Sequence, residues 1–211
     1  ALWSRAWVNL PGMHNIHSTI NFEENKTIKE YRLVQSKGIA SPTMAMSYSL
    51  SQTTQDGVVS YDCKMVKDTF VALSLKDKPV NEWILPNADG KGYGGFYPDS
   101  ISLVKLLNPS TIIKDDIGRA SWLVMLNELF LNGKVNVDSY YSVLIANLSR
   151  ETEPQIRQYL LDQVEQVWWK FFNADRRKAL SDQLETSIYQ LLISSNIKDD
   201  ERKPLYNSYV R

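Results

Sequence analysis

Cysteine and histidine, the side chains from which many catalytic and metal centres are built, are almost absent from this chain. Its 211 residues include one cysteine, Cys63, and two histidines, His14 and His17. A single cysteine excludes a disulfide within the chain. Cys63 lies in the alternating apolar run 59–65, which predicts a buried, inert thiol rather than a nucleophile.

The two histidines form an H-x-x-H pair. Ile16, Ile20 and Phe22 indicate that this segment is a strand, and residues three apart on a strand point to opposite faces. We therefore expect no metal site from His14 and His17 alone. The sequence also lacks the H-E-x-x-H zinc motif and the G-x-S-x-G nucleophile elbow.

Net charge and long apolar runs are missing as well. The 24 basic residues balance the 24 acidic ones, which argues against a broad nucleic-acid or membrane-surface footprint. No window approaches the roughly 20 apolar residues of a membrane span. The opening Ala-Leu-Trp-Ser-Arg has neither a signal-peptide pattern nor an initiator Met, from which we expect a fragment, a processed chain or an engineered start.

Apolar residues alternate with polar ones from about Trp7 to Tyr97, which is typical of half-buried antiparallel strands. About seven short strands separated by turn residues predict an antiparallel, Ig-like β-sandwich domain over residues 1–99. The predicted strands are Ile16–Phe22, Ile28–Gln35, Met44–Leu50, Val59–Met65, Thr69–Leu75, Glu82–Leu85 and Tyr93–Tyr97, with turns at 24–25, 36–38, 55–57 and 76–79.

After Asp99 the apolar spacing changes to the 3.6-residue period of helices. Short connections between the predicted helices indicate antiparallel α-hairpins, the start of an α-solenoid, and we expect residues 100–211 to be a truncated helical domain. The expected helix signals are N-caps at Asp116 and Asp138 and a helix stop at Asn132-Gly133. Pro154 is expected in the first turn of a third helix, and a fourth helix is expected to start near Asp175.

The segment 197–211 is polar up to Pro204 and then reads Leu205-Tyr206-Asn207-Ser208-Tyr209. It is compatible with a short further helix or with a docked tail. A cut helical stack leaves an unpaired apolar face. We expect either this tail or self-association of the chain to cover that face.

The sequence Trp168-Trp169 lies beside Phe171-Phe172 in the third predicted helix. Packing between helices is the expected role of this cluster. Adjacent residues diverge by about 100° around a helix, so one of the two tryptophans is expected near the surface, where it could mark an interface.

Two charged groups flank the same helix. Arg176-Arg177-Lys178 is expected to be a solvated helix start, with contact to an acidic neighbour as the alternative. Glu151-Thr152-Glu153 precedes Pro154 and is expected to begin a helix rather than to form a pair of catalytic carboxylates.

The segment Trp83–Tyr97 is the most informative part of the chain. Its Pro, Asn, Asp and Gly residues between two aromatic strands predict a β-hairpin. The glycines of 90–95 lack the order of a phosphate-binding loop and are not followed directly by a helix. A turn is therefore the expected role of these glycines.

This segment reads W-I-L-P-N-A-D-G-K-G-Y-G-G-F-Y and resembles the W-I-x-x-N-A-D-G-x-G-Y-x-x-F-Y strand pair of the aminopeptidase N family of zinc aminopeptidases. Three further segments resemble that family in the same order. Residues 7–13 resemble its W-x-x-x-P-G-x-P segment, residues 28–35 resemble its I-x-L-x-Q strand, and residues 119–133 resemble its helix with the R-A…L-x-G pattern. Departures include Pro98-Asp99 after the strand pair, Gly118 before Arg119, and Asn9 and Met13. They indicate a divergent, bacterial member, cytoplasmic or periplasmic.

In that family a preceding thermolysin-like domain holds the zinc, the H-E-x-x-H motif and the G-A-M-E-N-type loop, none of which occurs here. The resemblance therefore implies no catalytic, cofactor-binding or metal residue in this chain, which should be inactive alone. It implies a sandwich that acts as a spacer and helices that cap the catalytic cleft. The implied partners are the missing catalytic domain of the same polypeptide and, in the parent enzyme, peptide substrates.

Two alternatives belong to other classes. One is a free-standing protein- or peptide-binding module without enzymatic activity, in which the sandwich and helical hairpins present a groove. The other is an independent hydrolase with a site of its own. The coding sequence upstream of Ala1 distinguishes the aminopeptidase hypothesis from both, since only that hypothesis requires an H-E-x-x-H motif there.

Overall fold

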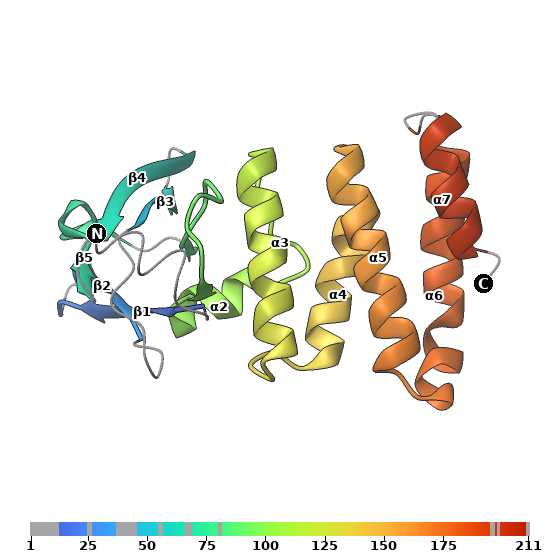
Figure 1. The fold of residues 1–211 in the computed structure, drawn as a ribbon, viewed down its shortest axis with the longest axis horizontal. Helices are drawn as coiled ribbons and strands as arrows, with labels where there is room; N and C mark the ends of the chain where they lie inside the picture. The colour runs from blue at the N-terminus through green and yellow to red at the C-terminus, as the bar shows by residue number, and fades with distance from the viewer. Residues whose placement is uncertain are drawn as a thin grey trace. The chain divides into compact units, whose positions relative to one another are not determined.

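The computed structural model describes residues 13–24, 27–36, 46–54, 57–65, 69–79, 82–194, 197 and 199–209. Strands come first along the chain and helices follow (Figure 1), which confirms the predicted order of β and α structure. The resembling segment at 7–12, the predicted start at Met44, and the turn residues 25, 37–38 and 55–56 lie outside the described residues.

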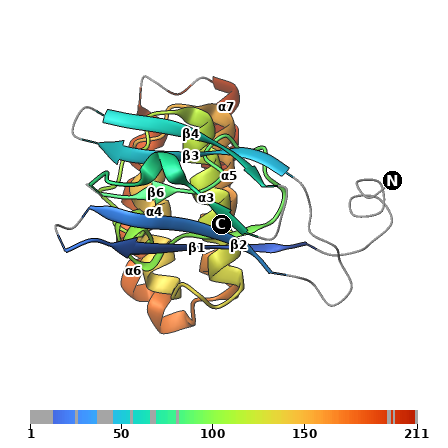
Figure 2. The same cartoon turned by 90° about the vertical axis from the view of Figure 1, so that its left-hand side faces the viewer.

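The first sheet contains four strands in the order β5-β2-β1-β7. β1 (Asn15–Phe22) pairs antiparallel with β2 (Ile28–Gln35), and β2 pairs antiparallel with β5 (Thr69–Val71). β7 (Gly95–Tyr97) runs parallel to β1, so this sheet is mixed rather than purely antiparallel as predicted. Figure 2 shows β1 and β2 side by side.

The second sheet contains three strands in the order β4-β3-β6. β3 (Met46–Thr54) pairs antiparallel with β4 (Gly57–Met65) and with β6 (Ile84–Leu85). Alternate residues are buried over much of β1, β2 and β3, as the period of two predicted. In β4 the prediction holds for Cys63, which is buried, but not for Val59, which is 41% exposed. Tyr48 of β3 meets Phe96 of β7 edge to face at 5.2 Å, so the two sheets share one core.

The predicted strand Thr69–Leu75 is too long. β5 ends at Val71, and Leu73–Leu75 forms a 3₁₀ turn closed by a hydrogen bond from Leu75 N to Ala72 O. Asp77 then adopts a positive φ of 64° and donates its N–H to Ile28 O. This turn directs the chain back to the edge of β2, where Thr27 and Pro79 form a bridge.

The predicted hairpin at Trp83–Tyr97 is wrong, although both of its strands exist. β6 belongs to the second sheet and β7 to the first, so the loop between them crosses from one sheet to the other. The Asn87 side chain accepts from Gly92 N at 2.6 Å and donates to Gly92 O at 3.1 Å. These bonds close a wide loop within segment 86–94. A hairpin would instead need a tight turn that pairs the two strands with each other.

Two helices adjoin the strands in the same compact unit, which comprises residues 1–106 and 111–132. α2 (Ser100–Leu106) was not predicted; Ser102 Oγ accepts from Ile84 N of β6. α3 (Asp116–Leu131) donates from Trp122 Nε1 to Leu106 O at 3.1 Å, and Ser121 donates to Asn87 O. These contacts explain why α3 clusters with the strands.

The second compact unit comprises residues 107–110 and 133–211. Its helices are α4 (Val137–Leu148), α5 (Pro154–Lys170), α6 (Ala174–Ile193) and α7 (Asp199–Tyr209). Successive helices of this unit alternate in direction in Figure 1. α7 packs against α5 and α6, so the tail is a helix that covers part of the helical face.

Two of the predicted helix signals need correction. The N-cap of α3 is Asp115, whose carboxylate accepts from Gly118 N at 2.7 Å, and Asp116 is already helical. The N-cap of α4 is Asn136, not Asp138. Asn and Asp are similarly good caps, so composition alone does not choose between neighbours. Pro154 at the start of α5 and Gly133 (φ 67°) beyond α3 are as predicted.

Candidate functional site

The two histidines do not come together as a ligand pair. His14 is buried, and its Nδ1 lies 2.7 Å from Ser36 O, to which it donates. His17 is exposed and stacks on Tyr97 with ring centroids 4.5 Å apart. Within the described parts of the chain, His, Cys, Asp and Glu form no group of three or more that could hold a metal ion.

Cys63 is buried in the second sheet, as predicted, with 1% of its surface exposed. Burial raises the pKa of the thiol to about 12, and the nearby Asp62 carboxylate adds to this effect. A thiol with such a pKa stays protonated near neutral pH, and the protonated form is a poor nucleophile. Its role is therefore that of a small core side chain.

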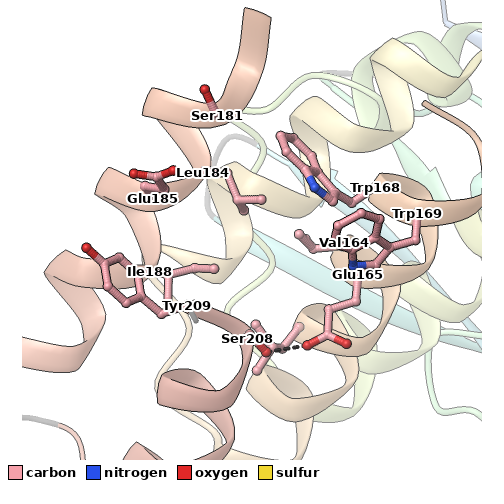
Figure 3. A pocket seen from close by; sticks show the side chains of 11 residues that line it. Val164, Glu165, Trp168, Trp169, Ser181, Leu184, Glu185, Ile188, Ser208 and Tyr209 are labelled. Carbon is pink, nitrogen blue, oxygen red and sulfur yellow. Dashed lines mark hydrogen bonds between the residues drawn. The ribbon is translucent and has the colours of Figure 1, made fainter. Parts of the chain in front are cut away.

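A pocket of about 170 Å³ lies among α5, α6 and α7 of the second unit (Figure 3). Its α5 wall consists of residues at helical spacing, Leu161, Val164, Glu165, Trp168 and Trp169, and its α6 wall repeats that spacing at Ser181, Leu184, Glu185 and Ile188. Ser208 and Tyr209 of α7 complete the lining.

The α5 wall divides the two tryptophans as predicted. Trp168 is half-buried, with its ring centroid 6.4 Å from that of Tyr141 and 6.2 Å from that of Phe172. Trp169 is 53% exposed, and the Arg177 guanidinium lies 5.3 Å from its ring centroid. Both indoles line the pocket. Trp168 therefore lies on its buried side and Trp169 on its solvent-exposed side.

Two carboxylates border the same pocket. Glu165 on α5 accepts a hydrogen bond from the Ser208 hydroxyl of α7. Glu185 on α6 is exposed to solvent. Figure 3 shows the two carboxylates on different helices, with the side chains of Val164, Leu184 and Ile188 within the same pocket. The site therefore combines indole faces, an aliphatic lining and negative charge.

The tail helix that closes the pocket is held by both apolar and polar contacts. Leu205 is 2% exposed, and the Tyr209 ring lies 6.2 Å from that of Tyr189 on α6. Arg202 donates to the carbonyl oxygens of Leu192, Ser194 and Ile197. The carbonyls of Leu192 and Ser194 lie at the end of α6, so one guanidinium both satisfies that helix end and anchors α7.

The other charged groups have structural roles. Arg176 forms an exposed ion pair with Asp138 of α4, so one member of the basic group contacts an acidic neighbour, the alternative considered from sequence. Arg177 donates to Phe172 O at 2.6 Å. Glu151 is buried, and its Oε1 accepts from the backbone N–H groups of Thr152 and Glu153, as expected at a helix start.

A second hollow, of about 390 Å³, lies in the first unit between segment 86–94 and α3. The adjoining face of α3 carries Ile117, Val124 and Leu131, seven residues apart and 49–60% exposed. Glu128 is the charged residue that lines this hollow. These three apolar side chains form an exposed stripe along one side of α3.

Comparison with known proteins does not place this chain in a family. No protein-family model matches the chain, and no curated protein matches its sequence. No helix in the described part of the chain is long and apolar enough to cross a membrane.

Sequence analysis identified the tryptophans but missed most of the pocket. Glu165, Glu185 and Leu184 have ordinary helical spacing and give no signal that they converge. The α7 wall could have been inferred from the spacing of Leu205 and Tyr209, which places them on one helical face.

Proposed function

We propose that this chain is the non-catalytic C-terminal region of a zinc-dependent aminopeptidase of the aminopeptidase N family, whose parent enzyme removes N-terminal residues from peptides. The observation that carries the proposal is the Trp83–Tyr97 motif with helices directly after it. Asn87 and Gly92, two residues of the motif, bond to each other to form the crossing loop. The motif thus acts as architecture rather than chemistry.

In this proposal residues 1–99 form an Ig-like β-sandwich that spaces the domains of the parent. Residues 100–211 begin an α-solenoid that caps the catalytic cleft and limits its chamber to small peptides. The core shared by the two sheets supports the first assignment, and the alternating directions of α4 to α7 support the second. Catalytic residues, zinc ligands and the substrate-gripping loop belong to a domain outside this chain.

The proposed partner of the chain is that catalytic domain, in the same polypeptide. The exposed stripe Ile117, Val124 and Leu131 beside the hollow of the first unit supports such a contact, because a helix face this apolar gains from being covered. Zinc and peptide substrates are partners of the parent enzyme. No nucleic acid is expected, since the charge is balanced.

The test of this proposal is the reading frame that contains the chain. We expect an H-E-x-x-H motif and a downstream glutamate ligand to be encoded upstream of Ala1 in the same frame. The full polypeptide should release amino acids from aminoacyl-p-nitroanilides, and a zinc chelator should abolish that activity. A frame without the motif would refute the proposal.

The pocket of the helical unit favours a second candidate, a binding module without enzymatic activity. A concave, mostly apolar site with a few polar groups is the usual form of a binding site. This candidate predicts ligand binding by the chain without any catalytic domain. Binding at the pocket together with a frame that lacks the zinc motif would favour it over the aminopeptidase assignment.

A further inference from the structure

We infer that Asn132, at the end of α3, is a site of spontaneous covalent modification, where the side-chain amide deamidates through a cyclic imide formed with Gly133. The inference does not depend on the proposed function. It rests on the sequence, the exposure and the hydrogen bonds of this helix end, which so far has only the role of a helix stop.

The Asn132-Gly133 pair is unique in the chain. Among all asparagines of the sequence, Asn132 is the only one that glycine follows. In this reaction the backbone nitrogen of the next residue must reach the asparagine side chain. Glycine hinders that approach least, because it has no side chain and the widest choice of backbone angles.

The structure leaves the pair accessible. Asn132 and Gly133 are both exposed, and Asn132 is the C-cap of α3 rather than part of the helix itself. Gly133 has φ 67°, and a Cβ built on it would meet no described atom within 4 Å. The backbone at Gly133 therefore has room to turn towards the Asn132 side chain.

One hydrogen bond opposes the reaction in the folded chain. Asn132 Nδ2 donates to Glu128 O at 2.8 Å, which ties the side-chain amide to the last turn of α3. Helix ends open at a low cost in free energy, far below that of global unfolding. The bond therefore slows the attack of Gly133 N without preventing it.

The reaction consumes only water. Gly133 N forms a bond to Asn132 Cγ, and the bond between Cγ and Nδ2 breaks. Nδ2 leaves as ammonia with the proton from the Gly133 amide, and a five-membered imide remains. Water then opens the imide at one of its two carbonyl groups, which gives aspartate or isoaspartate at position 132. No oxidant or reductant is needed.

The product changes the end of α3. A carboxylate cannot donate to Glu128 O as the Asn132 amide does. It also places negative charge beside the last carbonyl groups of a helix, where negative charge is unfavourable. At this peptide bond the chain passes from the first compact unit to the second, and isoaspartate adds one carbon atom to the backbone there.

The experiment incubates the full chain at mildly alkaline pH, folded in buffer and unfolded in guanidinium chloride, and follows each asparagine by peptide mapping with mass spectrometry. Asn136 is the internal control, because it is also exposed but is followed by the β-branched Val137. We expect aspartate and isoaspartate to form at Asn132 at least about tenfold faster than at Asn136 in both states. The folded chain should react at most about tenfold more slowly than the unfolded chain, since only a helix end must open.

Two variants test the effect on the helix. Asn132→Asp puts the deamidated residue at the end of α3, and Asn136→Asp makes the same change at the N-cap of α4, where aspartate is an equally good cap. Amide hydrogen exchange in the last turn of α3 should become about two- to fivefold faster in Asn132→Asp. Exchange in the first turn of α4 should stay within about twofold in Asn136→Asp.

Three results would overturn the inference. Equal rates at Asn132 and Asn136, or reaction at Asn132 in the unfolded chain with none in the folded chain, would show that the folded helix end is not a modification site. Unchanged exchange at the end of α3 in Asn132→Asp would show that the modification does not weaken that end.

Discussion

Gly94 illustrates how a single residue secures the crossing between the two sheets. It has φ 159°, and a Cβ at this position would lie 2.7 Å from His14 O and would also meet the Ile16 side chain. Those atoms belong to the start of β1, beside which β7 runs in parallel. The absence of a side chain therefore lets β7 reach its place in the first sheet.

Gly94→Ala should destabilise the strand-containing unit by about 3 kcal/mol, since the clash with backbone adds to an unfavourable φ. Urea denaturation measures the change. Gly57→Ala is the control, because Gly57 also has a positive φ, 126°, but a Cβ there would meet nothing within 4 Å. It should cost only about 1 kcal/mol. Equal costs would show that Gly94 is not sterically required.

The Cys63 thiol should react with a disulfide reagent much more slowly in the folded chain than in urea at pH 8, because it is buried and its pKa is raised to about 12. The measurement is the rate of absorbance change with an aromatic disulfide. A rapid reaction of the native chain would contradict the buried, protonated state.

The same thiol should make the fold sensitive to alkali. Its folded-state pKa is raised from 9.0 to about 12, so the stability it contributes is complete below about pH 9 and is lost as pH rises towards 12. Above pH 9 the unfolded chain releases the proton first, and the free energy of unfolding falls. Cys63→Ala should show a weaker decline, with buried tyrosines such as Tyr31, whose pKa burial also raises, accounting for the remainder.

At the scale of elements, helix starts depend on which side chain bonds the first free N–H groups. Asp115→Ala should cost about 1 kcal/mol, because Asp115 caps α3 through Gly118 N. Asp116→Ala loses an exposed ion pair with Arg119 and should cost less than about 0.5 kcal/mol. Thermal denaturation distinguishes the two. If Asp116→Ala lowered the stability more than Asp115→Ala, Asp116 would be the N-cap of α3.

The tail helix offers a second test at this scale. Leu205→Ala should destabilise the helical unit by about 2–4 kcal/mol, because Leu205 is 2% exposed where α7 packs on α5 and α6. Tyr206→Ala is the control, since Tyr206 is 58% exposed, and it should change stability by less than about 0.5 kcal/mol. Hydrogen exchange of α7 amides reports both changes. Equal protection in the two variants would mean that α7 is not docked as described.

At the scale of the whole molecule, the absence of an H-E-x-x-H motif from the sequence gives a direct prediction. The isolated chain should retain no stoichiometric zinc after dialysis and should release no amino acid from peptides, because it contains no H-E-x-x-H motif. Elemental analysis and an aminopeptidase assay measure the two. Stoichiometric zinc in the purified chain, or release of amino acids by it, would contradict the assignment of a non-catalytic region.

Local patterns in the sequence determined most element positions. The period of two located strands such as Ile28–Gln35, and the period of 3.6 located α3 to α6, because each period reflects which side of one element is buried. Gly133 and Pro154 punctuated the helices because their backbone preferences act within a few residues. The burial of Cys63 and the exposure of one of the two adjacent tryptophans followed from the same local geometry, whereas the structure shows that the exposed one is Trp169.

Tertiary structure decided what local patterns leave open. The segment Trp83–Tyr97 has the composition of a hairpin, yet its strands pair with β3 and β1, because the hydrogen bonds and burial available in two different sheets outweigh the local turn preference. The pocket likewise depends on Glu165, Glu185 and Tyr209, which lie on three helices. Sequence alone determined the order of strands and helices and most of their positions, whereas packing between distant segments determined the sheet partners and the pocket.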